Sequence, residues 1–358
     1  DVFSSLDSLN LSIKLNKDKC LSKSVDDIRT EGMELLGTVR SLDLSDAGDE
    51  WHRVDDVFRS AIRELRGSPR VLPTDEDLFH LPSYQGGLGI VSHARVAPFA
   101  RKAMAEQSGR QLQLILHPSS DLNQPPITQQ RTYTDVANAV RYKELSDGLD
   151  LYGKLQLAEN GTKLGRKPLT SLPFEPGLRF TNSEFKALLH LRTLCPGEAH
   201  ICRCGQHNTP GHDDICRDRV QIKTWRHDKV RDHLASYLKA AGVSVSTEKK
   251  LAPEDPHNLM RMDLVLSHAN GVGAYAMHDI TIHSASALAP YIASITKDWQ
   301  QKDGMQLLRA GLSHQAAKKV DKYRHVVSLD FVPLVFSAGG ALSAHTMDLF
   351  KAWRSIVP

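Results

Sequence analysis

The chain has 358 residues, and 41% of them are hydrophobic, so apolar cores for two or three domains are available. A formal net charge of +3, with both signs spread along the chain, indicates a mildly basic soluble protein, which permits nucleic-acid binding without arguing for it. No run of about 18 apolar residues occurs, which excludes a membrane-spanning helix, and the first residues, DVFSSLDSLN, resemble no signal peptide and contain no Met, as expected for a piece of a longer protein.

The N-terminal half is expected to hold a small α/β piece followed by helices. Residues 1–48 contain LSIKLN, whose alternation is typical of a strand. Residues 49–116 carry VDDVFRSAIREL, with apolar residues at helical spacing. Residues 117–180 begin as a polar, proline-bearing linker and continue as one or two helices over TDVANAVRYKELSDGLDLYGKLQL, with Thr134 or Asp135 as a possible cap. The proline-broken KPLTSLPFEPGLRF that follows is expected to be extended.

The C-terminal half is predicted to be an α/β domain behind a cysteine-rich segment. Residues 181–225 open with TNSEFKALLHLRTL, a helix with a polar cap at Thr181–Ser183 and with Glu184 in its first turn. Residues 226–358 are expected to run α-β-β-β-α-β-α. The expected elements are the helix WRHDKVRDHLASYLKAAG, the strands VSVSTEKKL, RMDLVLSH and GAYAMHDITI, a helical region over residues 285–323, the strand VVSLDFVPLVFS and the helix SAHTMDLFKAWRSI.

Three of the five cysteines and two histidines lie in the short segment CRCGQHNTPGHDDIC. Zn²⁺ takes four Cys or His ligands in a tetrahedral arrangement. The candidate ligands are Cys202, Cys204, His212 and Cys216. One helical turn brings His212 and Cys216 to one point. Two cysteines one residue apart would point to opposite sides of an extended chain, so the backbone must bend at Cys204–Gly205.

Other ligand sets remain open for this cysteine cluster. Cys195, His200 or His207 could replace one ligand. The alternative is a loop with incidental thiols. An odd number of cysteines, three of them crowded together, favours a metal site in a reducing compartment over a disulfide framework.

Two aspartates lie in apolar strand segments that are separated by a predicted turn. If that turn is centred on Gly271, Asp263 and Asp279 face each other with Cβ atoms about 5 Å apart. Opposed carboxylates repel each other unless a cation lies between them, and oxygen ligands of this kind suit Mg²⁺. The alternative places one or both aspartates on a solvated face, through a register shifted by one residue.

Basic residues near these aspartates are candidates for phosphate contacts. Lys319, Lys322 and Tyr323 share one face of a predicted helix, and Lys318 points elsewhere. Arg226 and His227 are predicted to open the helix after the cysteine cluster, where free N–H groups could bind a phosphate. Ordinary solvated faces are the alternative for both groups.

In this order, the cysteine cluster, an Arg-His-Asp helix start, two strand aspartates and Lys-x-x-Lys-Tyr resemble the C-terminal endonuclease of site-specific non-LTR retrotransposons. That endonuclease is a divergent member of the restriction-like PD-(D/E)xK nucleases. In the family the first aspartate follows proline, where this chain has Met262. The catalytic lysine moves to a later helix in the family, consistent with Thr281 two residues after Asp279.

The N-terminal half resembles the same kind of protein. LSIKLNKDKC and EGMELLGT are similar to the end of a reverse-transcriptase palm, and FHLPSYQGGLGI is similar to the segment after the palm and thumb. The resemblance implies that residues 1–48 are a palm remnant and residues 49–116 a thumb-like region. Residues 117–180 would be a linker, residues 181–225 a zinc knuckle and residues 226–358 the nuclease, in an α/β chain that is α+β overall.

The resemblance implies a Mg²⁺-dependent endonuclease that nicks target DNA for target-primed reverse transcription. Asp263 and Asp279 would hold the metal, Lys319 or Lys322 would assist, and Glu248 would add a ligand. Arg226, His227 and Tyr323 would contact nucleic acid. The expected cofactors are Zn and Mg, the expected partners are target DNA and the element's RNA, and the expected location is the nucleus. The alternatives are a non-catalytic nucleic-acid-binding scaffold and a decayed retroelement fragment.

We predict that this chain does not polymerise DNA. A polymerase palm holds its metals with carboxylates in a Tyr/Phe-Ala-Asp-Asp turn, and neither Asp26–Asp27 nor Asp55–Asp56 lies in an apolar hairpin of that kind. A primer-extension assay with the purified chain is expected to give no product, with a complete reverse transcriptase as the positive control. Template-directed incorporation by this chain would refute the prediction.

Overall fold

Helices account for most of the described chain, and the strands form two small sheets, so the fold is α+β. The computed structural model describes residues 44–116, 129–171, 179–196, 201–206, 212–251, 260–267, 275–325 and 330–356. By its contacts the chain divides into two units, residues 1–57 and 58–358. The predicted strand LSIKLN lies outside the described residues. Among the described helices, none has the length and apolar character that a membrane crossing requires.

The predicted N-terminal helices are present. They are α4 (Leu44–Arg66), α5 (Asp75–His80), α6 (His93–Leu116), α7 (Gln130–Gly148) and α8 (Leu151–Gly161), with a short 3₁₀ turn at Ser83–Gln85. The predicted cap at Thr134 or Asp135 is wrong, because α7 begins at Gln130 and the Thr134 hydroxyl donates to the Gln130 carbonyl inside the helix. Asp150 caps α8 by accepting from the Gly153 amide.

A buried arginine joins the glycine-rich segment after α5 to the helices that precede the cysteine cluster. Arg192 ends α10 (Asn182–Arg192) and is 1% exposed. Its guanidinium donates to the carbonyl oxygens of Gly87 and Gly165, each at 2.8 Å, and of Asn160 at 3.2 Å. Carbonyl oxygens rather than a carboxylate therefore satisfy this buried charge.

The start of α10 is confirmed, and the segment before it is partly corrected. Thr181 and Glu184 form the reciprocal pair of hydrogen bonds known as a capping box. Residues KPLT, predicted to be extended, form the one-turn helix α9 (Lys167–Thr170), because Pro168 fits the first turn of a helix. Residues 172–178 lie outside the described part of the chain.

The helix after the cysteine cluster starts earlier than predicted. The one-turn α11 (His212–Ile215) and a 3₁₀ turn at Arg217–Arg219 lead directly into α12 (Val220–Ala240). Arg226 and His227 therefore lie in its second turn, where the amides are already bonded within the helix. The predicted phosphate site at free N–H groups beside these two residues is wrong. The continuous helix also crosses the predicted boundary between residues 181–225 and 226–358.

The strands follow the predicted order, with two predicted strands each divided in two. The larger sheet has the order β1-β2-β3-β5, and β4 pairs with β6 in a separate parallel sheet. The strands are β1 (Ser244–Lys250), β2 (Arg261–Ser267), β3 (Tyr275–His278), β4 (Ile280–His283), β5 (Asp330–Phe331) and β6 (Leu334–Ser337). GAYAMHDITI divides at Asp279, between β3 and β4, and the chain passes there from one sheet to the other.

The register predicted for the two aspartates is the one that the strands adopt. In the antiparallel pair of β2 and β3, Leu264 lies opposite His278 and Val265 opposite Met277. The next position outward places Asp263 beside Asp279, just beyond the last bridged pair.

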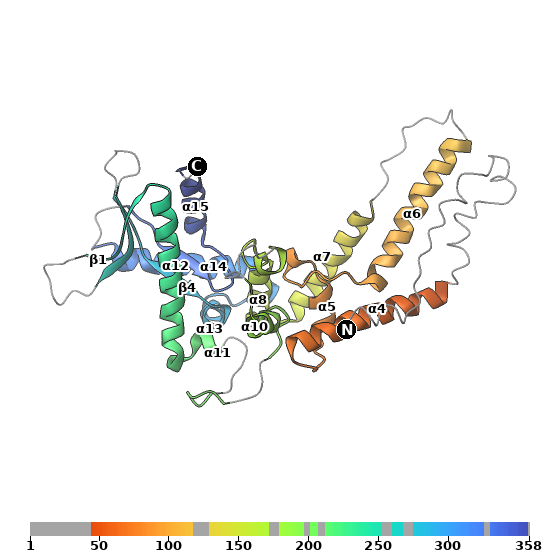
Figure 1. The fold of residues 1–358 in the computed structure, drawn as a ribbon, viewed down its shortest axis with the longest axis horizontal. Helices are drawn as coiled ribbons and strands as arrows, with labels where there is room; N and C mark the ends of the chain where they lie inside the picture. The colour runs from red at the N-terminus through yellow and green to blue at the C-terminus, as the bar shows by residue number, and fades with distance from the viewer. Residues whose placement is uncertain are drawn as a thin grey trace. The chain divides into compact units, whose positions relative to one another are not determined.

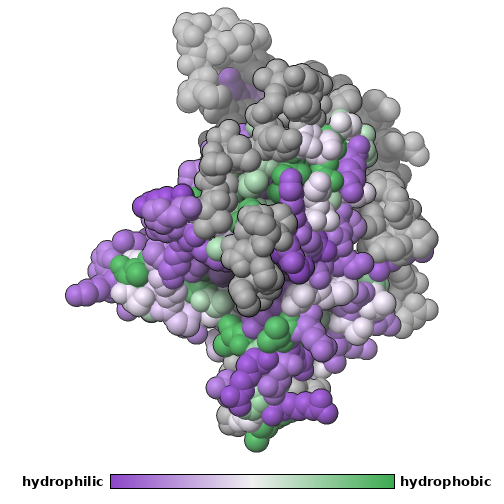
Figure 2. Space-filling model, turned by 90° about the vertical axis from the view of Figure 1, so that its left-hand side faces the viewer, coloured by the Kyte–Doolittle hydropathy of each residue, from purple (hydrophilic) through white to green (hydrophobic). Residues whose placement is uncertain are grey.

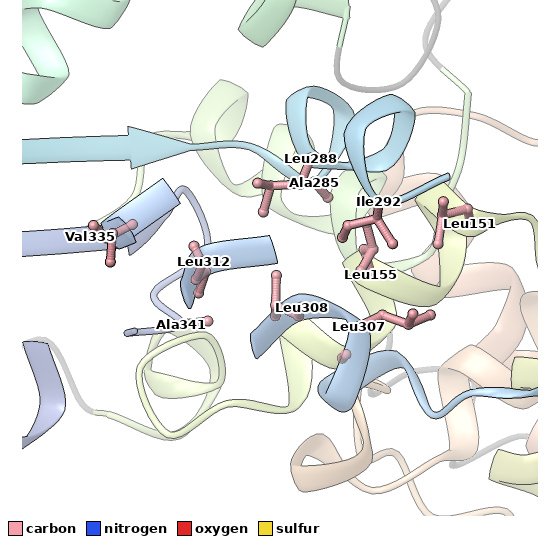
Figure 3. Packing of buried hydrophobic residues seen from close by; sticks show 12 residues of the cluster. Leu151, Leu155, Ala285, Leu288, Ile292, Leu307, Leu308, Leu312, Val335 and Ala341 are labelled. Carbon is pink, nitrogen blue, oxygen red and sulfur yellow. The ribbon is translucent and has the colours of Figure 1, made fainter. Parts of the chain in front are cut away.

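The two largest apolar cores of the described residues hold the C-terminal elements together, beside a smaller cluster around Met262, Val265 and Tyr323. The first lies between α8, α13 (Ala285–Ile295) and α14 (Gly304–Tyr323), where Figure 3 shows Leu155, Leu288, Ile292 and Leu308 gathered together. The second joins α12 and α15 (Ala344–Ile356) to the strands through Leu238, Leu264, Leu334 and Trp353. Figure 1 shows α12 running alongside the strands. Figure 2 shows mainly hydrophilic side chains on the visible described surface, with apolar ones in small groups.

Candidate functional site

Four side chains of the cysteine segment converge in the way that a metal ion requires. The ligand atoms of Cys202, Cys204, His212 and Cys216 all lie within 4.8 Å of one another. The Cys202 and Cys216 sulfurs are 3.7 Å apart, and the Cys204 sulfur is 3.3 Å from Nε2 of His212. A tetrahedral zinc ion with bonds of about 2.3 Å to sulfur would place two sulfurs about 3.8 Å apart. The predicted ligand set is thus brought together, and its spacing fits zinc.

The local backbone explains how two cysteines one residue apart reach the same point. The chain turns between Cys202 and Gln206, with the Gly205 amide donating to the Cys202 carbonyl and the Cys202 amide donating to the Gln206 carbonyl. Gly205 has φ of +83°, a conformation that glycine adopts without strain. The bend predicted at Cys204–Gly205 is confirmed. Cys195 is buried outside this group, and His200 and His207 lie outside the described residues.

The thiols of this cluster differ in acidity. The backbone amide of Cys204, and then the His212 ring, lower the pKa of the Cys202 thiol to about 6. Burial raises the pKa of the Cys216 thiol. Zinc binds thiolates and displaces their protons, so the low pKa of Cys202 favours metal binding near neutral pH.

An ion pair connects the cysteine cluster to α12. Asp214 lies between the ligands His212 and Cys216, and its Oδ1 accepts from Nη1 of Arg226 at 2.8 Å. Arg226 directly precedes His227 on α12. The ion pair therefore connects the segment that carries the four candidate ligands to the part of α12 that carries His227.

The first strand aspartate is buried and accepts two hydrogen bonds. Asp263 is 8% exposed, and its Oδ2 accepts from the Ile280 amide at 2.5 Å and lies 3.1 Å from Nε2 of His227. The hydrogen bond to Asp263 raises the pKa of His227 to about 9, against the effect of partial burial, and Asp228 adds to the increase. His227 is consequently a cation at neutral pH, paired with a buried carboxylate.

The second strand aspartate is held by α14. Asp279 is 7% exposed, and its Oδ2 lies 2.5 Å from Nζ of Lys319. The Tyr323 hydroxyl donates to Oδ1 of Asp279 at 3.1 Å, and burial followed by the Asp279 charge raises the pKa of Tyr323. Lys322 donates to the Tyr323 hydroxyl at 3.1 Å, so it reaches the aspartate only through the tyrosine. The structure therefore assigns the direct contact to Lys319.

Lys318 differs from Lys319, as the sequence predicts. Its Nζ lies 4.8 Å from the centre of the Tyr291 ring on α13. It forms no ion pair with an acid among the described residues. Adjacent lysines on α14 thus have different surroundings.

The pairing of β1 with β2 places Glu248 near Asp263, but arginines bind its carboxylate. The β1–β2 ladder pairs Thr247 with Leu264 and resumes at Lys249, so Glu248 lies opposite Asp263 at an interrupted position. Its φ of +55° is uncommon for a residue with a Cβ atom. Its carboxylate contacts Arg231 and Arg261. The structure shows these two arginines, rather than Asp263, as its partners.

Sequence reasoning missed two residues of this region. Arg231 joins Asp228 and Glu248, and its position one turn after His227 on α12 was the available signal. His283 lies at the end of β4, four residues after Asp279, and so on the same face of the strand. Neither belongs to the ordered set of residues that resembles the retrotransposon endonuclease.

No protein-family model matches the chain, and no curated protein matches it either. What the site does must therefore be argued from its own residues.

We predict that the purified protein carries one zinc ion, held by the cluster of three cysteines and one histidine. Metal analysis by mass spectrometry is expected to find one equivalent, which Cys204→Ser combined with Cys216→Ser removes. Cys195→Ser, which changes a buried cysteine outside the cluster, is the matched control and should keep the metal. Absence of zinc from the wild type, or its retention by the double variant, would show the assignment to be wrong.

The His227–Asp263 pair predicts a pH dependence of stability. The folded pKa of about 9 exceeds the unfolded value of about 6.5, so the stability from the pair is complete below pH about 6.5 and is lost as pH rises through 9. The free energy of unfolding of His227→Gln should therefore approach that of the wild type as pH rises across this window. Denaturant titrations of the zinc-loaded protein without added magnesium measure this difference. A difference independent of pH would contradict the charged pair.

Proposed function

We propose that this chain is a metal-dependent endonuclease with a restriction-like core, which nicks target DNA for retrotransposon integration by target-primed reverse transcription. The observation that carries the proposal is the pair of buried carboxylates in the predicted register, with Asp263 inside β2 and Asp279 between β3 and β4. Lys319 contacts the second of them. Two acids and a lysine on an α/β core are the groups that a nuclease of this type uses.

The donor set of the two aspartates fits Mg²⁺, which prefers carboxylate oxygens. Oδ2 of Asp263 and Oδ1 of Asp279 accept hydrogen bonds, and Oδ2 of Asp279 has the ion pair with Lys319 but no hydrogen bond. Oδ1 of Asp263 has no partner in the described part of the chain. That oxygen is the one that a cation can approach without displacing a side chain. A bound Mg²⁺ ion would activate a water molecule and offset negative charge on the scissile phosphate.

The chain's own residues would contribute charge and orientation. Lys319, 25% exposed and beside Asp279, can reach a phosphate in the site and stabilise the charge that develops in the transition state. Tyr323 orients Asp279 by its hydrogen bond, and Lys322 positions Tyr323. Glu248 would add a carboxylate next to Asp263 if released from Arg231. Arg226 and His227 would contact the nucleic acid on the α12 side.

By the same resemblance, the zinc knuckle would bind target DNA or the element's RNA beside the nuclease. The segments before it would be remnants of a reverse transcriptase, and the site of action would be the nucleus. The metal-ligand convergence and the Asp214–Arg226 ion pair support a knuckle fixed to α12.

A non-catalytic nucleic-acid-binding scaffold is the second candidate, and one observation favours it. Each buried aspartate already has a cationic partner, His227 or Lys319, as in a structural ion pair that needs no metal. A decayed retroelement fragment would look the same. Cleavage assays on the variants below separate an enzyme from these alternatives.

We predict that Asp263→Asn and Asp279→Asn each abolish nicking of supercoiled plasmid in the presence of Mg²⁺. Each change removes a carboxylate that the metal requires and keeps the shape of the side chain. DNA binding and zinc content should remain. Asp298→Asn, in the exposed turn before α14, is the matched control and should cleave normally. Normal nicking by Asp279→Asn would mean that the enzyme assignment is wrong.

We predict that Lys319→Ala lowers the single-turnover nicking rate by roughly a hundredfold while DNA affinity changes little, because its charge acts mainly in the transition state. Lys318→Ala, which changes the neighbouring lysine, should cleave at the wild-type rate once DNA is saturating. The measurements are single-turnover nicking and binding titrations for each variant, including Lys322→Ala. If all three lysine variants lose DNA affinity equally and cleave normally at saturating DNA, α14 only binds phosphate. The catalytic role of Lys319 would then be wrong.

A further inference from the structure

Asp228 on α12 contacts a histidine and an arginine with the same carboxylate oxygen. Its Oδ1 lies 3.3 Å from Nδ1 of His227 and accepts from Nη1 of Arg231 at 3.1 Å. The side chain of Asp228 is 41% exposed, whereas that of Arg231 is 13% exposed. The carboxylate therefore lies between a partly buried ring and a largely buried guanidinium, which together set its position.

His227 continues this series of contacts to the acidic pair. Its Nε2 lies 3.1 Å from Oδ2 of Asp263, so both nitrogens of the ring face carboxylate oxygens. A carboxylate at one nitrogen of an imidazole holds the ring in the orientation in which the other nitrogen acts. The contacts thus run without a gap from Arg231 through Asp228 and His227 to Asp263.

Two further acids hold Arg231 in place. Its Nε donates to Oδ1 of Asp232 at 2.9 Å, and its Nη1 contacts Glu248 on β1. A guanidinium is planar and rigid, so contacts at these nitrogens fix the direction in which Nη1 meets Asp228. Asp232 shares this arginine with Asp228, but no contact joins it to His227 among the described residues. The two aspartates therefore differ in their link to the acidic pair.

We infer that Asp228 is a positioning residue of the metal site, which holds His227 against Oδ2 of Asp263 and so leaves Oδ1 of Asp263 available to the metal. The inference rests on the proposed function for the presence of a metal ion at Asp263. Asp228 contacts neither the metal nor DNA in this account, because it acts through the His227 ring. Hydrogen-bond partners that orient metal ligands commonly change the metal affinity by about 10–100-fold when they are mutated.

A positioning effect of Asp228 is distinguishable from the effect of its charge. A nearby acid raises the affinity for a cation by its charge alone, and Asp228→Ala and Asp228→Asn remove that charge equally. A positioning acid acts through the hydrogen bond that it accepts, which the amide oxygen of Asp228→Asn can still accept. Asp232→Ala is the matched control, because it removes an acid that pairs with the same arginine.

The test is Mn²⁺ binding to the zinc-loaded protein in the absence of DNA, followed by the electron paramagnetic resonance signal of free Mn²⁺. This ion takes the same oxygen ligands as Mg²⁺. Asp263→Asn should abolish the site and thereby identifies it. Thermal unfolding establishes that each variant is folded, as expected for Asp228→Ala because alanine favours a helix and the side chain that it replaces is partly exposed.

We expect Asp228→Ala to weaken Mn²⁺ binding roughly tenfold, as the loss of a residue that orients a ligand does. Asp228→Asn should recover most of the affinity, and Asp232→Ala should bind Mn²⁺ as the wild type does. In a His227→Gln background, Asp228→Ala should have little further effect, because the two residues act in series.

Wild-type affinity in Asp228→Ala, or an equal loss in Asp228→Ala and Asp228→Asn, overturns the positioning role. An undiminished loss in the His227→Gln background overturns the route through His227. Absence of Mn²⁺ binding by the wild type overturns the inference as well. A wild type that binds Mn²⁺ with the expected dependence on Asp228 but does not nick plasmid would overturn the proposed nuclease and leave the positioning role standing.

Discussion

Two buried carboxylates set the main constraint on this fold. Asp263 and Asp279 are each less than a tenth exposed, and an unpaired charge at such a depth would cost several kcal/mol. Each is balanced by a cation from a different helix, His227 on α12 and Lys319 on α14. The pairs therefore fix both helices at the point where the chain passes from β3 to β4. Replacing a buried ion pair by apolar residues of similar size is often neutral or stabilising, so stability alone does not require these acids, and we interpret them as functional.

The same constraint extends to the cysteine cluster. Arg226 holds Asp214, which lies between two of the metal ligands, and the next residue, His227, holds Asp263. A short segment without a core of its own keeps its shape through metal binding. Binding of a metal by the four side chains would fix Asp214, which pairs with Arg226 in the second turn of α12. The metal site and the acidic pair would then be connected through α12. Loss of the metal would displace His227 before it affected the sheets.

The sequence predicts most elements of the C-terminal region and the residues that come together in it. The alternation of apolar and polar residues, with a turn centred on Gly271, correctly predicted the register that pairs Asp263 with Asp279. Both signals lie within a short stretch of sequence. The division at Asp279 depends on pairing of β4 with β6, more than fifty residues later, which no local pattern records. The start of α12 was missed because no polar cap precedes Val220. The left-handed conformation of Glu248, which turns its carboxylate toward Arg231, also has no signal in the sequence.

The central claim is that the acidic pair is a magnesium-dependent nuclease site. It is tested most directly by incubating zinc-loaded protein with supercoiled plasmid, with Mg²⁺ and without it, and by following the open-circular form on a gel. Omitting magnesium, instead of adding a chelator, keeps the cysteine cluster loaded. Our account predicts open circles only when Mg²⁺ is present. Intact plasmid in the presence of Mg²⁺, with the protein folded and bound to the DNA, would contradict it and favour the scaffold.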